Sequence, residues 1–152
     1  MVLVLETINE NDKKKAYLRE YRASVRRVTR IEEELKEIRT MKTSISIMYD
    51  DMPRGTGQSD LSSYAAELDK LERELVAERY RRVMLYKDIS SRIKCLKSKN
   101  ENDVLFYRYI KGLDWWDIAE QMGYSERQIY RFHGKGLGHF ELPKNKDVSK
   151  CQ

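Results

Sequence analysis

Residues 112–137 read GLDWWDIAEQMGYSERQIYRFHGKGL, and this stretch decides the fold of the C-terminal part of the chain. Asp114 is placed to cap a helix that ends at Gly123, because a glycine just past the last turn commonly stops a helix. Ser125 and Gln128 have the S-x-x-Q spacing of a capping box, which starts a second helix. Two short helices around a glycine turn are typical of a helix-turn-helix, whose second helix enters the major groove of DNA.

Apolar side chains on these helices are spaced to form a small core. A preceding helix over 103–111, capped by Asn100 or Asn102, is expected to pack behind the pair. The predicted core consists of Val104, Leu105, Tyr109, Leu113, one of the two tryptophans, Ile118, Met122, Ile129, Phe132 and Leu137. Trp115 and Trp116 are adjacent and cannot both point inward, so we expect Trp116 to be partly exposed or to contact a partner.

The first two thirds of the chain predict two long helices, at about 10–48 and 60–97, joined by a loop over 49–59 that contains Pro and Gly. In the first helix, apolar residues recur every seven positions at Tyr21, Val28 and Leu35, interleaved with Ile31, Ile38 and Ile45. In the second they recur at Leu61, Leu68, Leu75, Ile89 and Leu96, with Tyr64, Leu71 and Leu85 between them and Arg82 interrupting. The eleven-residue loop favours an antiparallel hairpin within one chain. The alternative is that each stripe pairs with a second chain in a coiled coil.

The predicted fold class is therefore all-α: a long antiparallel, coiled-coil-like helical hairpin followed by a small three-helix helix-turn-helix domain. We assign the hairpin to residues 1–98, the helix-turn-helix domain to 103–141 and a flexible tail to 142–152. Because two helices rarely bury all their apolar surface, we expect a homodimer that forms through the hairpin.

Charge is segregated along the chain, which carries a net charge of +5. Residues 12–30 carry a net charge of +6 and residues 79–100 carry +7, whereas residues 31–78 carry −6. An antiparallel hairpin brings the two basic blocks together at the end that leads into the helix-turn-helix. We expect this end to neutralise DNA phosphates; the alternative is a solvated helix face. The side chains assigned to backbone contact are Lys13, Lys14, Lys15, Arg81 and Arg82.

The predicted reading helix, 126–137, presents polar side chains suited to base edges in its first turns. Arg127 and Arg131 suit guanine, and Glu126 suits cytosine. Gln128 suits adenine, unless its side chain is occupied in the capping box. The predicted phosphate contacts on and next to this helix are Ser125, Tyr130, His133 and Lys135. Its three glycines, at 134, 136 and 138, predict a weak C-terminal end that frays or orders only on DNA.

The sequence predicts no enzyme, no cofactor and no metal site. His133 and His139 have no nearby carboxylate pair, and the chain has no glycine-rich phosphate loop and no nucleophile motif. Two cysteines, Cys95 and Cys151, cannot build a disulfide framework, so a reducing cytosol is expected. The opening MVLVLETI has no basic leader and no spanning length, so we expect neither secretion nor a membrane anchor.

The segment from Val104 to Leu137 resembles region 4 of bacterial sigma factors, the part that reads the −35 promoter element. The chain from about residue 50 to residue 140 resembles the small ArpU/RinA-like transcription regulators of phages and prophages of Gram-positive bacteria. The matching stretches are MPRGTG at 52–57 and YIKGLDWWDIAEQMGYSERQIYRFHGKGL at 109–137. The resemblance implies base and phosphate contacts at Ser125, Glu126, Arg127, Gln128, Tyr130 and Arg131. One departure is that residues 101–126 are acidic, with a net charge of −4.

These expectations describe a sequence-specific DNA-binding transcriptional regulator of phage or prophage genes in the cytoplasm of a bacterial host. Its partners would be double-stranded DNA and a second copy of the chain, with host RNA polymerase as a further candidate. The alternative is a non-enzymatic protein-interaction adaptor whose hairpin binds RNA polymerase or a phage packaging protein. A third possibility is a structural coiled coil with an incidental helical tail.

Overall fold

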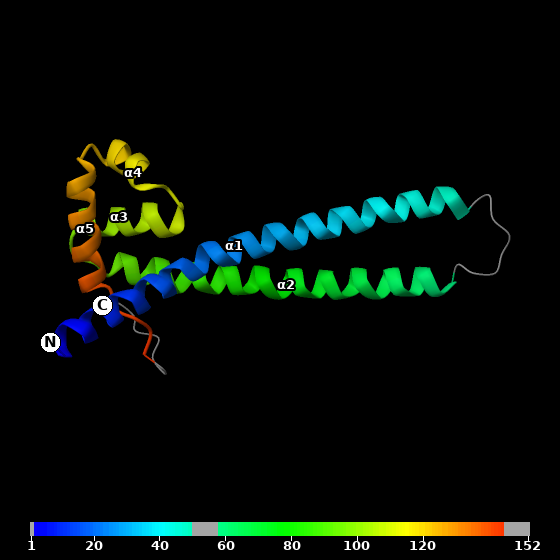
Figure 1. The fold of residues 1–152 in the computed structure, drawn as a ribbon, viewed down its shortest axis with the longest axis horizontal. Coiled ribbons are helices and arrows are strands. Elements are labelled where there is room, and N and C mark those ends of the chain that lie inside the picture. Colours follow the sequence, from blue (N-terminus) through cyan, green and yellow to red (C-terminus); the bar gives the residue numbers. More distant parts are fainter. Residues whose placement is uncertain (1, 50–57, 145–152) are drawn as a thin grey trace. The chain divides into compact units, whose positions relative to one another are not determined.

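In a computed structural model of the protein, the described backbone covers residues 2–49 and 58–144, and the described side chains cover 10–42 and 61–144. The regular elements in these ranges are all helices, so the predicted all-α class is confirmed (Figure 1). They are α1 (Val2–Tyr49), α2 (Gln58–Lys94), α3 (Lys99–Leu105), the π-helix η1 (Phe106–Ile110), α4 (Trp115–Met122) and α5 (Glu126–His139). Among the described residues, none of these helices combines the length and apolar character needed to cross a membrane.

The chain divides into two compact units. One, here called the hairpin unit, is Ser24–Arg82, and the other, here called the helix-turn-helix unit, is Met1–Ala23 together with Val83–Gln152. We had expected a boundary between residues 98 and 103. The division lies elsewhere because the start of α1 and the end of α2 pack with the short helices. The start of α1 and the end of α2 are therefore part of the unit that carries the helix-turn-helix.

In the hairpin unit, α1 and α2 pack on each other within one chain. The buried core consists of Val28, Leu35, Leu71 and Leu75, with Ile31, Ile38 and Leu68 partly buried against it. These are the predicted seam positions. Leu61, also predicted for the seam, is 44 % exposed. Ile45 lies outside the described side chains, and most of the predicted loop lies outside the described residues.

Ion pairs between the helices agree with an antiparallel arrangement in this unit. Arg27 Nε donates to Glu78 Oε1 at 2.8 Å, while the later residue Arg39 donates to the earlier residue Glu72 at 3.2 Å. Ser24 also donates to Glu78, at 2.9 Å. The acidic and basic side chains of this unit thus pair across the apolar seam.

Several helix ends differ from the prediction. α1 begins at Val2 and not near residue 10, and α2 ends at Lys94, after which the chain turns. The cap of α3 is Ser98, whose side chain accepts from Glu101 N at 3.4 Å, and not Asn100 or Asn102. Asn102 instead donates to the carbonyl oxygen of Ile93 at 2.9 Å, which satisfies a carbonyl in the last turn of α2.

The helix after α3 widens into a π-helix. Lys111 N donates to Phe106 O at 3.1 Å, five residues back. The turn that follows requires Gly112, which has φ +72°, a left-handed conformation that other residues seldom adopt. A Cβ at this position would also lie 2.7 Å from Arg22 Nε, so the Arg22 side chain would have to shift.

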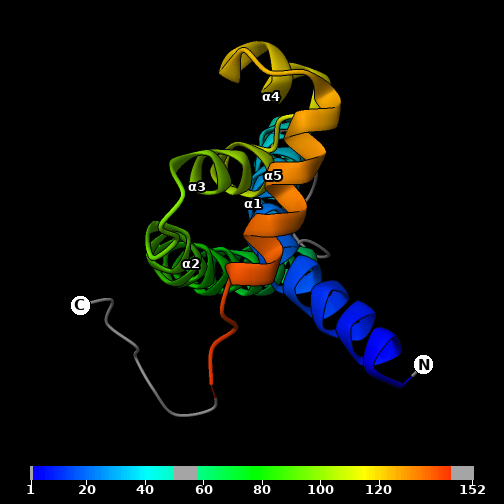
Figure 2. The ribbon, with the colours of Figure 1, turned by 90° about the vertical axis from the view of Figure 1, so that its left-hand side faces the viewer.

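The core of the helix-turn-helix unit matches the prediction closely. Val104, Ile118, Ala119 and Ile129 are buried, and Tyr107, Leu113, Trp115, Met122 and Phe132 pack against them. Leu105, Tyr109, Leu137 and Phe140 are buried as well. Trp116 is 62 % exposed, as expected for the outward member of the tryptophan pair. Within this unit α5 packs on both α3 and α4 (Figure 2).

Candidate nucleic-acid interface

The turn between α4 and α5 has the cap chemistry that its sequence predicts. Asp114 Oδ1 accepts from the N–H of Asp117 at 2.9 Å and caps α4. Gly123 has φ +72°, and its N–H donates to Ala119 O at 2.9 Å, which ends α4. Ser125 Oγ then accepts from the N–H of Gln128 at 3.2 Å and starts α5. Local hydrogen bonds therefore fix both ends of the turn and the direction in which α5 leaves it.

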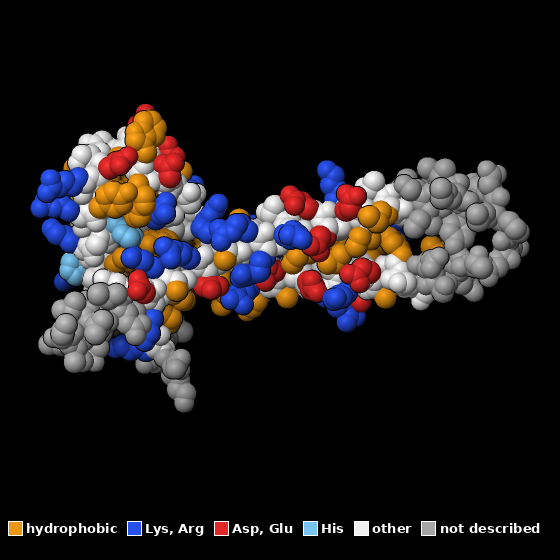
Figure 3. Space-filling model, viewed as in Figure 1, with side chains coloured by type: hydrophobic (Ala, Val, Ile, Leu, Met, Phe, Trp, Pro, Cys, Tyr) orange, Lys and Arg blue, Asp and Glu red, His pale blue; other side chains and the backbone are white. Residues whose placement is uncertain are grey.

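The outer face of α5 is basic. Arg127, Arg131 and Lys135 are exposed and are spaced by four residues, so they lie along one side of the helix. None of the three has an acidic partner among the described residues. Figure 3 shows Lys and Arg side chains gathered along the α5 edge of this unit. We call Arg127, Arg131 and Lys135 the reading face.

The other predicted contacts near the start of α5 lie around this face. Ser125, Glu126 and Tyr130 are exposed, and Gln128 is half-buried. Of the predicted capping box, the structure contains the bond from the Gln128 backbone to Ser125. The described hydrogen bonds include none from the Gln128 side chain, so its amide is available for an outside partner.

His133 does not occupy the position predicted for a phosphate contact. It is buried, 8 % exposed, and its Nε2 lies 2.8 Å from the hydroxyl oxygen of Tyr109. Its ring stacks on Tyr109 at 5.8 Å and meets Trp115 edge-on at 4.7 Å. Burial, together with the positive charges of Lys15, Arg108 and Arg19, lowers the pKa of His133 to about 4. The predicted backbone contact is wrong for this residue because its ring forms part of the core.

Lys14 also differs from its predicted role as a DNA backbone contact. It is 5 % exposed, and its Nζ donates to the carbonyl oxygens of Leu137 at 2.9 Å and Gly138 at 3.5 Å. The ammonium also lies 3.4 Å from Glu10 Oε1. A lysine held in this way caps the C-terminal end of α5, where a positive charge is favourable. It is therefore not available for the DNA contact predicted for it.

The remaining basic residues assigned to phosphate are distributed between the two units. Lys13 is exposed and Lys15 is partly buried, and both belong to the helix-turn-helix unit. Arg81 is exposed and Arg82 half-buried, and both belong to the hairpin unit.

The C-terminal end of α5 is more regular than its three glycines predicted. The helix continues to His139 and is followed by Phe140, whose N–H donates to Gly136 O at 2.8 Å. His139 Nδ1 lies 2.8 Å from Oε2 of the buried Glu101. A Cβ on Gly136 would lie 3.3 Å from Leu105 Cγ, so this glycine lets α5 approach α3. Packing and the lysine cap act against the low helix propensity of these glycines, and fraying of this end stays a prediction.

Arg108, a residue that the sequence did not single out, connects η1 to the start of α4. Its guanidinium carbon lies 4.4 Å from the centre of the Trp115 ring, and its Nη1 donates to Leu113 O at 3.0 Å. The stacking geometry and distance are those of a cation–π contact. No spacing in the sequence indicated this residue, because the π-helix changes which positions share a face.

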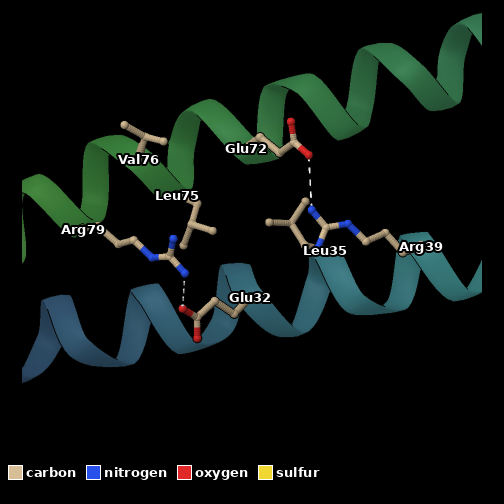
Figure 4. A pocket seen from close by; sticks show the side chains of 7 residues that line it. All are labelled: Glu32, Leu35, Arg39, Glu72, Leu75, Val76 and Arg79. Carbon is tan, nitrogen blue, oxygen red and sulfur yellow. Dashed lines mark hydrogen bonds and ion pairs between the residues drawn. The ribbon is translucent and has the colours of Figure 1, made fainter.

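The described surface includes a hollow in each unit. One lies in the hairpin unit and is lined by Glu32, Leu35, Arg39, Glu72, Leu75, Val76 and Arg79 (Figure 4). Its charges are paired across the helices, Arg79 with Glu32 at 2.8 Å and Arg39 with Glu72 at 3.2 Å. The other lies beside the turn and is lined by Trp116, Ala119, Glu120, Gly123, Tyr124, Ser125 and Glu126. Its two glutamates make it unfavourable for phosphate.

Cys95 Sγ lies 3.2 Å from the carbonyl oxygen of Ser91. Cys151 lies outside the described residues, and the cytoplasmic location remains a prediction. Comparison with known proteins adds no identification: no family model, no curated protein and no solved structure matches the chain.

Proposed function

We propose that the protein binds double-stranded DNA in a sequence-specific manner and reads the major groove with α5. The observation that supports this proposal most is the reading face itself. Arg127, Arg131 and Lys135 have no acidic partners among the described residues and project from the second helix of a capped helix-turn-helix. The opposite side of α5 is fully used in the core, so the basic side is the one available to a partner.

Each exposed residue has a role that its chemistry suits. Arg127 and Arg131 can each donate two hydrogen bonds to O6 and N7 of a guanine. Glu126 can accept from N4 of cytosine, and the amide of Gln128 can pair with adenine. Tyr130 and Lys135 lie where they can contact phosphates, as does Ser125 at the start of the helix.

The biological setting of this activity is part of the proposal and depends on the sequence resemblance. Regulation of phage or prophage genes follows from the likeness to ArpU/RinA-like regulators and sigma region 4. A homodimer is expected because one small module buries little surface on DNA, and two half-sites raise both affinity and specificity. Contact with host RNA polymerase is the mode of action that the sigma-like segment implies.

Selection of binding sites from random DNA at physiological salt is the direct test. We expect an enriched motif, and its symmetry will report whether two copies bind. Arg131→Ala should then weaken the cognate site by about 1–3 kcal/mol and relax preference at one base position. Lys135→Ala is the matched control, since loss of a phosphate contact should weaken all sequences alike. Absence of any enriched motif would overturn the proposal.

A second candidate, a protein-interaction adaptor, is favoured by two exposed apolar side chains of the hairpin unit. Val76 and Tyr80 are each 68 % exposed and lie one helical turn apart on α2. The double variant Val76→Ser/Tyr80→Ser distinguishes the two roles. If the hairpin acts only as a spacer, this variant will regulate transcription as the wild type does, and DNA selection will be unchanged.

A further inference from the structure

The helix-turn-helix unit carries a second basic surface, on α1. Lys15, Arg19 and Arg22 are spaced by four and three residues, so they form a row on one side of the helix. Arg19 is exposed, and Lys15 and Arg22 are partly buried. We call these three residues together with Arg108 the basic row.

Two members of the basic row contact the part of this unit that supports α5: Arg22 at Gly112 and Arg108 at the Trp115 ring. The Arg22 guanidinium lies against the backbone of Gly112. The positive charges of Lys15, Arg19 and Arg108 help to lower the pKa of the buried His133 ring. Those of Arg19 and Arg108 oppose the rise that burial causes in the pKa of Tyr109. Figure 3 shows Lys and Arg side chains next to a histidine and a group of apolar side chains on this unit.

The charge of the basic row is not neutralised by the fold. Within the described residues Arg19, Arg22 and Arg108 have no acidic partner, and the one acidic neighbour of Lys15 is Asp12, at 4.0 Å. Several like charges held close together repel one another, and a polyanion relieves that repulsion. The hollow by the turn, with Glu120 and Glu126, has the opposite character. The basic row is therefore the surface next to α5 that best suits phosphate.

Tyr130 connects the basic row to the reading face. It is 49 % exposed, its ring centre lies 4.9 Å from that of Trp115, and it directly precedes Arg131. Trp115 in turn carries the Arg108 guanidinium on its ring. Tyr130 thus lies between the reading face and the Trp115 ring that carries Arg108. A helix in the major groove has phosphate backbones on both flanks.

We propose that Lys15, Arg19, Arg22 and Arg108 bind the phosphate backbone of the DNA duplex whose major groove α5 reads. This inference rests on the proposed function and assigns the nonspecific attraction to α1 of the same unit. From Lys15 to Arg22 the row spans about 10 Å along the helix. One DNA strand carries about three phosphates over that length. The assignment replaces Lys14, which caps α5.

The test measures how DNA affinity depends on salt for three proteins: the wild type, the row variant Lys15→Gln/Arg19→Gln/Arg22→Gln and the control variant Arg30→Gln/Lys36→Gln/Arg73→Gln. The control removes the same charge from exposed positions in the hairpin unit. Arg108 is left unchanged because it also holds Trp115. We expect the slope of log affinity against log salt to fall in magnitude by about 2–3 in the row variant, at about 0.9 for each phosphate contact. The control should keep the wild-type slope.

Further comparisons separate failure of the row from failure of the reading face. The row variant should weaken selected and random duplexes by the same factor, whereas Arg131→Ala should weaken the selected duplex more. If the row variant keeps the wild-type slope while Arg131→Ala loses discrimination, the basic row is wrong and the proposed function stands. If the wild type binds no duplex at low salt, both are wrong. Arg19→Gln alone, at an exposed position, should reduce the slope by about 0.9 if the triple variant fails to fold.

Discussion

Lys14 and Leu137 lie 123 positions apart in the chain, yet the Lys14 ammonium donates a hydrogen bond to the Leu137 carbonyl oxygen at 2.9 Å. This bond joins the N-terminal part of the long helix α1 to the last turn of α5. It also puts a positive charge at the negative end of the α5 dipole. The helix that carries the reading face is thus held at its C-terminal end by a residue from the opposite end of the sequence.

We expect Lys14→Met to reduce the free energy of unfolding by about 1–3 kcal/mol, because the carbonyls of Leu137 and Gly138 lose their buried donor. Methionine keeps the apolar stem, so the change isolates the ammonium. Urea unfolding followed by circular dichroism measures the effect. Lys13→Met, at the exposed neighbouring position, is the control and should stay within about 0.5 kcal/mol of wild type. Equal losses in the two variants would contradict the cap.

His133 makes the stability of the fold depend on pH. Burial and neighbouring positive charges lower its pKa from 6.5 to about 4. Above pH 6.5 the imidazole is neutral in both folded and unfolded chains, and it contributes no pH dependence. Between pH 6.5 and 4 the unfolded chain takes up a proton that the folded chain refuses, so stability falls as the pH falls, by up to about 3 kcal/mol.

The difference in unfolding free energy between wild type and His133→Gln, measured from pH 7 to pH 4, isolates this contribution from that of the carboxylates. Glutamine can still accept from Tyr109 but does not titrate. As the pH falls, we expect the unfolding free energy of the wild type to decrease relative to that of the glutamine variant. An imidazole that titrates near 6.5 by nuclear magnetic resonance would refute the prediction.

The glycines of α5 should respond unequally to alanine. At Gly134 and Gly138 a Cβ would meet nothing within 4 Å, so alanine should stabilise the helix by about 0.5–1 kcal/mol at each position. At Gly136 the new methyl group would press on Leu105 Cγ at 3.3 Å, which offsets the gain. Thermal denaturation of the three single variants ranks their stabilities. A gain at Gly136 as large as at the other two would contradict close packing of α5 on α3.

Substitution of the two adjacent tryptophans by alanine should change the stability of the protein by very different amounts. Trp115 contacts Arg108, Tyr130 and His133, and we expect Trp115→Ala to cost roughly 3 kcal/mol, at the lower end for a packed tryptophan. Trp116 is 62 % exposed, so Trp116→Ala should change stability by less than about 0.5 kcal/mol. Urea unfolding of the two variants makes the comparison.

Local chemistry explains what the sequence predicted well. Asp114, Gly123 and Ser125 act on neighbours within four residues, so their roles follow from spacing alone. The seven-residue repeat of Val28 and Leu35 likewise indicates a buried stripe. These signals were sufficient for the helix class, the turn and most of the core.

Contacts between distant segments explain what the sequence did not predict. Lysine and histidine usually lie on the surface of a protein. The burial of Lys14 and His133 depends on a carbonyl or hydroxyl group that a distant part of the chain supplies. The start of α3 was misplaced because Ser98, Asn100 and Asn102 are all acceptable caps, and Asn102 bonds to the end of α2 instead. Arg108 was missed because a π-helix cannot be recognised from apolar periodicity.

The π-helix from Phe106 to Ile110 decides which of its side chains reach the neighbouring helices. A π-turn, bonded from residue i to residue i+5, holds about one residue more than an α-turn. Removing one residue from this segment would restore ordinary winding and leave the flanking elements in nearly the same orientation, because either kind of turn closes one full rotation. Within the segment, however, the side chains would change places, and the contact of Tyr109 with His133 or that of Arg108 with Trp115 would be lost. Related chains that lack one residue here should therefore keep the helix-turn-helix fold and lose one or both of these contacts.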